Sequence, residues 1–342
     1  MRRYIYSLMT DETNTFPARA LKVILAAAAG FYLSGITLRK ALYKAGVFRT
    51  HRADALVMSV GNITLGGTGK TPFTIMLARF IKEKMDKNPV VLIRGYGLDE
   101  QVMARDLLCG IPLMIGRDRV RNSSSAIARY NADTIILDDG FQHLRMARDL
   151  DIVLIDARRP FGNDRLFPRG ILREPIGALK RADIAVLTKA DRNLADKEFL
   201  ISRVKRINKD ILLLEAVHAA RHLWDLKTKE RFSPLELKGK KVHLVSAIGD
   251  PAYFEETVKG LGAVINGHSV YEDHHNYSAK DMKDISRRAS GCAIVTTEKD
   301  AVKLGAVRRT PYAVRWLALH VDVVITKGEE ELIGRLNRLY SR

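Results

Sequence analysis

The sequence has few cysteines, and their spacing suggests no paired site. Its 342 residues include only two, Cys109 and Cys292, which lie far apart. This excludes a disulfide framework or a cysteine-based zinc site and favours a reducing cytosol. Tight Lys/Arg clusters with interleaved aromatic residues are also missing, although the net charge is +18. We therefore expect no nucleic-acid partner, and an anionic membrane surface or a phosphorylated substrate instead.

No uncharged run is long enough for an unambiguous membrane span. Residues 23–38 form an uncharged run of 16 residues, whereas a spanning helix needs about 20. The first 50 residues hold eight Lys/Arg and two Asp/Glu. A signal peptide is disfavoured because the segment has no A-x-A-like cleavage site. A buried helix of the soluble core is an alternative. We favour a helix lying in the membrane interface, with Tyr32 and Tyr43 at the headgroup level.

Apolar segments alternate with helical ones from residue 56 onward. They are continuous rather than alternating, which is typical of parallel strands covered on both faces. The expected strands are 56–61, 90–94, 113–116, 134–137, 152–155 and 184–187, and a helix is expected over 72–84. This pattern predicts an α/β fold with a doubly wound, mainly parallel P-loop sheet.

A second group of elements follows a change in composition. Residues 190–210 are charged and predicted to be helical, and residues 218–240, rich in His, Lys and turn formers, are predicted to be a linker. Later elements are expected at 242–246, 254–260, 293–297 and 313–319. We predict an N-terminal membrane-associating segment (1–50), a P-loop domain (51–215) and a smaller α/β domain (216–342).

A glycine-rich turn between the first strand and the first helix has the pattern of a phosphate loop. Its members are Thr64, Gly66, Gly67, Thr68, Gly69, Lys70 and Thr71. Glycines let backbone N–H groups approach phosphates, and the following helix adds its positive end. Lys70 is expected to reach the β- and γ-phosphates and Thr71 to bind magnesium. Thr64 stands where the strict pattern has glycine, so the loop is a variant.

Two adjacent carboxylates, Asp138 and Asp139, end the strand predicted at 134–137. P-loop enzymes use an acid at such a strand end to hold magnesium. Because successive side chains on a strand point to opposite sides, we expect only one of them to face the metal. A rival interpretation rests on residues 188–191, which read TKAD. In some GTPases a similar motif binds guanine, so a GTPase or metallochaperone-like switch is the alternative.

Several motifs together resemble the tetraacyldisaccharide 4′-kinase family of the lipid A pathway. They occur in the family's order over roughly residues 40–305 and include SVGNITLGGTGKTP (59–72), RGYG (94–97), DDGFQH (138–143), LREP (172–175), YEDHHNYS (271–278) and TTEKDAVKL (296–304). The resemblance implies an enzyme that uses ATP and Mg²⁺ to phosphorylate the 4′-hydroxyl of a tetraacylated glucosamine disaccharide 1-phosphate. It also implies a peripheral, monotopic protein at the cytoplasmic face of a bacterial inner membrane.

The resemblance also assigns roles to individual residues. Asp99 is the expected acceptor of the hydroxyl proton and His274 its partner, although the altered motif around Asp99 leaves Glu100 or Asp106 as alternatives. The candidate metal ligands are Thr71, Asp138, Asp139, Gln142 and Glu174. The candidate substrate-binding residues are Asn62, Arg94, His143 and Arg173.

Overall fold

The computed structural model describes residues 2–95, 98–190, 196–273, 275–289, 291–305 and 314–341. The chain divides into two compact units. Unit 1 comprises residues 1–94, 110–217 and 324–342, and unit 2 comprises residues 95–109 and 218–323. The chain therefore passes between the units four times. A division of the sequence after residue 215 would place residues 95–109 in the P-loop domain and residues 324–342 in the smaller domain. The structure instead assigns residues 95–109 to unit 2 and residues 324–342 to unit 1.

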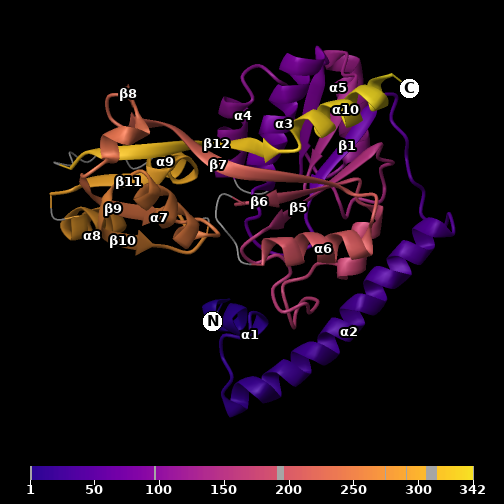
Figure 1. Cartoon of the computed structure of the whole chain (residues 1–342), viewed down its shortest axis with the longest axis horizontal. Coiled ribbons are helices and arrows are strands. Elements are labelled where there is room, and N and C mark those ends of the chain that lie inside the picture. Colours follow the sequence, from indigo (N-terminus) through magenta and orange to yellow (C-terminus); the bar gives the residue numbers. More distant parts are fainter. Residues whose placement is uncertain are drawn as a thin grey trace. The chain divides into compact units, whose positions relative to one another are not determined.

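Unit 1 is a parallel sheet with flanking helices (Figure 1). The strand order is β7-β6-β5-β1-β4-β2-β3, and each of these neighbouring pairs is parallel. The helices α3 and α5 pack on β2. The elements are α1 (Arg2–Met9), α2 (Phe16–Lys44), β1 (Leu56–Gly61), α3 (Lys70–Met85), β2 (Pro89–Ile93), β3 (Leu113–Ile115), α5 (Arg119–Tyr130), β4 (Thr134–Asp138), β5 (Leu150–Asp156), η1 (Ile176–Arg181), β6 (Ile184–Thr188), α6 (Lys197–Ile207), the first part of β7 (Leu212–Asp225), the end of β12 (Trp316–Lys327) and α10 (Glu329–Tyr340).

The expected parallel α/β fold is confirmed. Strands β2, β4 and β6 are buried along their whole length, which explains why their sequences are apolar apart from Thr134, Asp138 and Thr188 at strand ends. In the register of the central strands, Val57 is opposite Ile135 and Val60 is opposite Ile152. This arrangement brings the carboxyl ends of β1 and β4 to the same edge, where P-loop proteins bind phosphates.

Unit 2 is a smaller α/β unit. Strands β10, β9, β11 and β12 follow one another as parallel neighbours, and β8 pairs antiparallel with β7. Helix α4 packs against α9. The elements besides β7 and β12 are α4 (Leu98–Leu107), β8 (Arg231–Phe232), η2 (Pro234–Leu237), β9 (Lys241–Ser246), α7 (Pro251–Gly260), β10 (Val264–Val270), α8 (Ala279–Ala289), β11 (Ala293–Thr297) and α9 (Glu298–Gly305).

The predicted linker at 218–240 is wrong. Strand β7 continues to Asp225, and β8 and η2 lie within the remainder. Leu223 and Asp225 are buried, whereas Arg221 is exposed. Residues 218–222 of β7 are half-buried or exposed, and this part of the strand becomes buried only at Leu223 and Asp225, so the stretch has no apolar run by which a strand could be recognised. Within 190–210, the described helix is α6, and residues 191–195 lie outside the described part.

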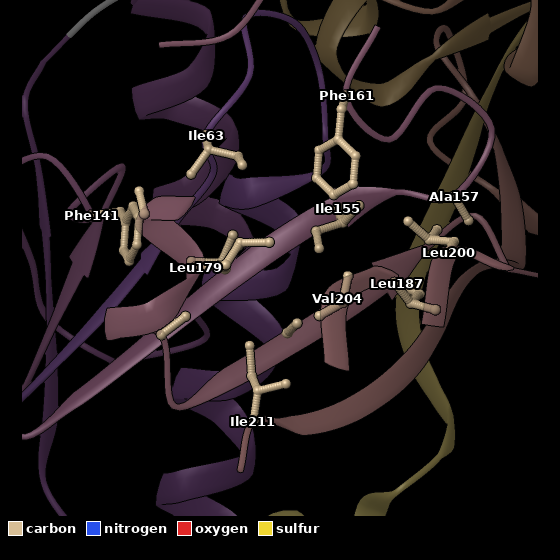
Figure 2. Close-up of a cluster of buried hydrophobic side chains, with 14 of the residues drawn as sticks. Ile63, Phe141, Ile155, Ala157, Phe161, Leu179, Leu187, Leu200, Val204 and Ile211 are labelled. Atoms are coloured by element: carbon tan, nitrogen blue, oxygen red, sulfur yellow. The ribbon is translucent and has the colours of Figure 1, made fainter. Parts of the chain in front are cut away.

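A hydrophobic cluster beneath the phosphate loop joins segments that are distant in sequence. Ile63, Phe141, Phe161 and Leu172 each have at most 1% of their surface exposed. Figure 2 shows Ile63, Phe141 and Phe161 together with side chains of β5, β6 and α6. Burial of each such side chain contributes about 1.5–3 kcal/mol. The cluster thus anchors the phosphate loop, the segment after the aspartate pair and the 161–175 loop to one core.

The N-terminal apolar run is part of a longer helix than the sequence suggested. Helix α2 has 29 residues, starts with Pro17 in its first turn and is drawn as one uninterrupted helix in Figure 1. It is long and apolar enough to span a membrane, with a mean hydropathy of 1.7 in its best window, of which only 6% is buried. The alternative of a buried core helix is therefore wrong. Flanking basic residues did not end the helix because Arg and Lys are good helix formers.

Candidate active site

The phosphate loop follows β1 directly and leads into α3. Gly66 and Gly69 have φ angles of 111° and 82°, in the left-handed region that favours glycine. Gly66 and Gly67 are exposed, so their backbone is accessible to a ligand. Gly61 is required for another reason, because an added Cβ would lie 2.6 Å from Cβ of Phe141. The loop has the open backbone that phosphate binding needs.

Hydrogen bonds from three directions fix the loop. The Asn62 side chain donates to Oγ1 of Thr68 (3.0 Å), and the Thr188 hydroxyl donates to the Thr68 carbonyl (3.2 Å). The Leu65 amide donates to the carbonyl of Ile171 (2.7 Å). Asn62 is fully buried, and its Oδ1 has no hydrogen-bond partner among the described residues. The predicted substrate-binding Asn62 is therefore placed inside the loop, where its side chain supports Thr68.

Asp138 faces the start of α3. Oγ1 of Thr71 donates to Oδ2 of Asp138 (2.8 Å), and Oγ1 of Thr74 donates to Oδ1 (3.1 Å). Burial raises the pKa of Asp138, although the hydroxyl of Thr71 and the charge of Lys70 oppose this. A hydroxyl and a carboxylate at this separation form an oxygen donor set that suits Mg²⁺. The residues present therefore fit the predicted metal.

Asp139 has different partners from Asp138 and follows the end of β4 with a left-handed φ of 52°, so the alternation expected along a strand does not apply to it. Nη1 of Arg173 donates to both carboxylate oxygens (2.8 and 3.0 Å), and Nζ of Lys70 lies 3.7 Å from Oδ1. Burial would raise the pKa of Asp139, but Lys70 and Arg173 hold it below its ordinary value. Asp139 is thus an ionised carboxylate between two cations that can also bind phosphate.

Glu174 is the centre of an ion-pair network. It is 3% exposed, and its carboxylate contacts Arg181 (2.7 and 2.9 Å) and Nζ of Lys40 from α2 (2.5 Å). Gln142 donates from Nε2 to Oε1 of Glu174 (3.1 Å) and to the carbonyl of Asn62 (2.9 Å). The two candidate metal ligands Gln142 and Glu174 therefore contact each other, and Gln142 also contacts Asn62, which lies between β1 and the phosphate loop.

His143 and Arg94 complete the candidates of unit 1. Burial and neighbouring arginines, first Arg119, lower the pKa of His143 to about 4, so the imidazole is neutral near pH 7. Its Nε2 is buried without a hydrogen-bond partner among the described residues. Arg94 follows β2 and is exposed.

The predicted proton acceptor and its histidine are largely outside the described part. His274 is not among the described residues, and of Asp99 and Glu100 only the helical backbone of α4 is described; Asp106 lies in the same helix. Helix α4 packs on α9, and Nζ of Lys299 in α9 lies 3.1 Å from Oδ1 of Asp273. Helix α4, which carries Asp99, and the segment 271–278, which carries His274, both belong to unit 2.

The TKAD segment has partners of its own. Lys189 is 3% exposed, and its Nζ lies 2.5 Å from Oδ2 of Asp156. Asp191, which would bind guanine in the rival interpretation, lies outside the described residues.

Sequence reasoning missed several residues of the site. Thr74, which also donates to Asp138, lies one helical turn after Thr71, so helical spacing could have identified it. The Arg119 guanidinium donates to the carbonyls of Asp138 and Asp139, and Lys40 and Arg181 bind Glu174. No local pattern distinguishes these three cations from the many others in the chain.

Comparisons with known proteins identify the family of the chain. The sequence profile of the family described as "LpxK: Tetraacyldisaccharide-1-P 4′-kinase" matches residues 21–106 and 99–340. A tetraacyldisaccharide 4′-kinase of Syntrophus aciditrophicus is 37% identical over 89% of this chain and 90% of its own length. One from Elusimicrobium minutum is 38% identical over 91% and 89%, respectively.

A solved structure is similar over most of both chains. LpxK from Aquifex aeolicus, crystallised in complex with ATP, has a TM-score of 0.73 and 27% identity, covering 93% of this chain and 99% of that one. These matches do not favour the GTPase alternative. The chain belongs to the tetraacyldisaccharide-1-P 4′-kinase family.

Proposed function

We propose that this protein transfers the γ-phosphate of ATP to the 4′-hydroxyl of a tetraacylated glucosamine disaccharide 1-phosphate. The observation that supports this proposal most directly is the phosphate loop, in which Thr71 is hydrogen-bonded to Asp138 and Lys70 lies close to Asp139. Phosphoryl transfer asks mainly for positioning and charge neutralisation, which this arrangement supplies. Family membership supports the acceptor, because the relatives carry it in their names.

Thr71 and Asp138 are the residues we assign to Mg²⁺. Bound Mg²⁺ would neutralise charge on the triphosphate. Lys70 and the exposed amides of Gly66 and Gly67 bind the phosphates, and Arg173 and Asp139 orient Lys70 from the other side. We do not assign Glu174 a place on the metal, because Arg181 and Lys40 already neutralise its carboxylate.

Asp99, oriented by His274, accepts the proton of the sugar hydroxyl in this proposal. The hydroxyl oxygen forms a bond to the γ-phosphorus while the bond from that phosphorus to the β-phosphate oxygen breaks, which yields ADP and the 1,4′-bisphosphate lipid. Support comes from the packing of α4 on α9 and the ion pair between Lys299 and Asp273, next to His274. An alcohol is a poor nucleophile until its proton has an acceptor.

We place the protein at the cytoplasmic face of a bacterial inner membrane, held by α2. Phe16, Val23, Ile24 and Phe31 of this helix are 65–85% exposed, which is the surface a lipid phase would cover. ATP and a glycolipid acceptor are both accessible at that face.

The decisive experiment supplies γ-labelled ATP, MgCl₂ and the purified disaccharide monophosphate in detergent micelles. We expect label in a bisphosphorylated lipid, and none with Lys70→Met protein. Label released only as inorganic phosphate, with the lipid unlabelled, would overturn the proposal in favour of a nucleotide hydrolase.

A further inference from the structure

Helix α2 is connected to the active site by three polar contacts. Its Tyr32 hydroxyl donates to the carbonyl of Arg173 (3.0 Å), and Nη2 of Arg39 donates to the carbonyl of Gln142 (3.2 Å). Nζ of Lys40 lies 2.5 Å from Oε2 of Glu174. Of the three contacted residues, Arg173 binds Asp139 and Gln142 donates to Glu174, so α2 contacts residues of the candidate site and not only the surface of unit 1.

The Lys40 contact continues into the phosphate loop. Oε1 of Glu174 accepts from Gln142, whose Nε2 also donates to the carbonyl of Asn62. The Asn62 side chain in turn donates to Oγ1 of Thr68 within the loop. Each step of this path is a hydrogen bond or an ion pair of 2.5–3.1 Å. A change at Lys40 therefore reaches the loop residue Thr68 through Glu174, Gln142 and Asn62.

Burial makes this path sensitive to charge. Glu174 and Asn62 are at most 3% exposed, and partners of a buried carboxylate interact more strongly than partners in water. Glu174 keeps Arg181 when Lys40 is removed, so loss of Lys40 alters the orientation of the carboxylate without leaving it unpaired. The protein is then expected to fold, with Gln142 and Asn62 held less firmly.

We infer that Lys40 is a positioning residue for the phosphate loop, and that the seating of α2 on Glu174 sets the affinity for ATP. The inference rests on the proposed function and adds a link from the membrane-associating helix to nucleotide binding. A protein with α2 displaced from this seat binds ATP more weakly than one with α2 in place.

The test measures binding of a fluorescent ATP analogue to full-length protein in detergent, with no lipid acceptor. Lys40→Met is expected to raise Kd about five-fold, within the range of coupling between contacting residues. Lys44→Met removes the same charge from an exposed position of the same helix and is expected to leave Kd unchanged. Lys40→Arg keeps the charge and is expected to restore most of the affinity.

A second comparison separates the path from a general loss of structure. In a Glu174→Gln background, Lys40→Met should have no further effect on Kd, because its charged partner is gone. Equal Kd values for the Lys40→Met and Lys44→Met proteins, or an undiminished effect in the Glu174→Gln background, would overturn the inference.

Two further outcomes complete the test. Should the methionine variant fail to fold, Lys40→Gln and Lys44→Gln test the same link, and equal Kd values there would also overturn it. Wild-type protein that bound no ATP analogue would overturn the kinase proposal together with the inference, whereas normal wild-type binding with equal variants would overturn the inference alone.

Discussion

Neighbouring aspartates have opposite electrostatic environments in this site. Asp138 is buried against two threonine hydroxyls, and burial raises its pKa. Asp139 is bound by Arg173 and lies near Lys70, which outweigh burial and lower its pKa. We therefore expect replacement by asparagine to affect catalysis differently at the two positions.

Asp138→Asn should abolish most turnover by removing the carboxylate beside Thr71. We expect kcat at saturating ATP to fall by about 100-fold or more, a typical effect of losing an electrostatic group at a reacting phosphate. The measurement is kcat over a MgCl₂ titration, with Asp86→Asn at the exposed end of α3 as the matched control. An unchanged dependence on MgCl₂ would contradict the role given to Asp138.

Lys70→Met should act on ATP binding itself. The Lys70 ammonium is the cation of the phosphate loop, and we expect Kd for an ATP analogue to rise by about ten-fold or more. Lys82→Met removes an exposed lysine of the same helix and is expected to be neutral. Similar Kd values for the two variants would show that Lys70 of the loop does not bind the triphosphate.

At the scale of elements, α2 combines two surfaces with different partners. One surface carries the contacts to Arg173, Gln142 and Glu174. The other is apolar and exposed, with Val23, Ile24 and Phe31 between 65% and 81% accessible. With 29 residues, the helix is about 43 Å long, so it can hold both surfaces along its length.

Replacement of Val23, Ile24 and Phe31 by glutamine should release the protein from membranes. Each buried apolar side chain contributes about 1.5–3 kcal/mol, so we expect the partition coefficient into anionic phosphatidylglycerol vesicles to fall at least about ten-fold. Co-sedimentation measures it. Phe199→Gln on α6, 61% exposed, is the control. Equal partitioning of both proteins would place the membrane contact elsewhere.

At the scale of the whole molecule, unit 2 has a buried cation that does not belong to the active site. His320 is 6% exposed and contacts Glu298 (2.8 Å) and Asp322 (3.3 Å). Hydrogen bonds to Asp322 and Glu298 raise its pKa to about 9. His222 stacks on its ring with a centroid distance of 4.6 Å, and burial lowers the pKa of that histidine.

The stability of unit 2 should therefore depend on pH. Because the pKa of His320 is higher in the folded than in the unfolded protein, its contribution is complete below about pH 6.5 and is lost as pH rises through 9. The loss is on the order of 3 kcal/mol in the free energy of unfolding. Urea titrations at pH 6 and pH 9.5 measure it through Trp224 and Trp316, both in unit 2.

His320→Gln should remove most of this pH dependence. His51→Gln changes an exposed histidine and should retain it. A wild-type unfolding free energy that is equal at both pH values would mean that His320 does not carry the charge we assign to it.

Local patterns in the chain were sufficient to locate the glycine-rich loop, the aspartate pair and strands β1 to β6 of the P-loop unit, but not β7. The reason is physical: continuous apolar runs form covered parallel strands, and glycine tolerates the φ angles of Gly66 and Gly69. The family motifs around residues 138–143 and 172–175 pointed to the same site. The sequence predicts a linker in the second half of β7 because residues 217–222, which are half-buried or exposed, form no apolar run.

Tertiary structure alone decided which distant residues support the site. The contact of Lys40 with Glu174, the binding of Arg119 to the carbonyls of the aspartate pair and the membership of residues 95–109 in unit 2 follow from packing. A lysine on an amphipathic helix has the same local sequence whether it faces water or a buried carboxylate. Only the fold brings the two charges together, because the contact is made between segments that share no local pattern.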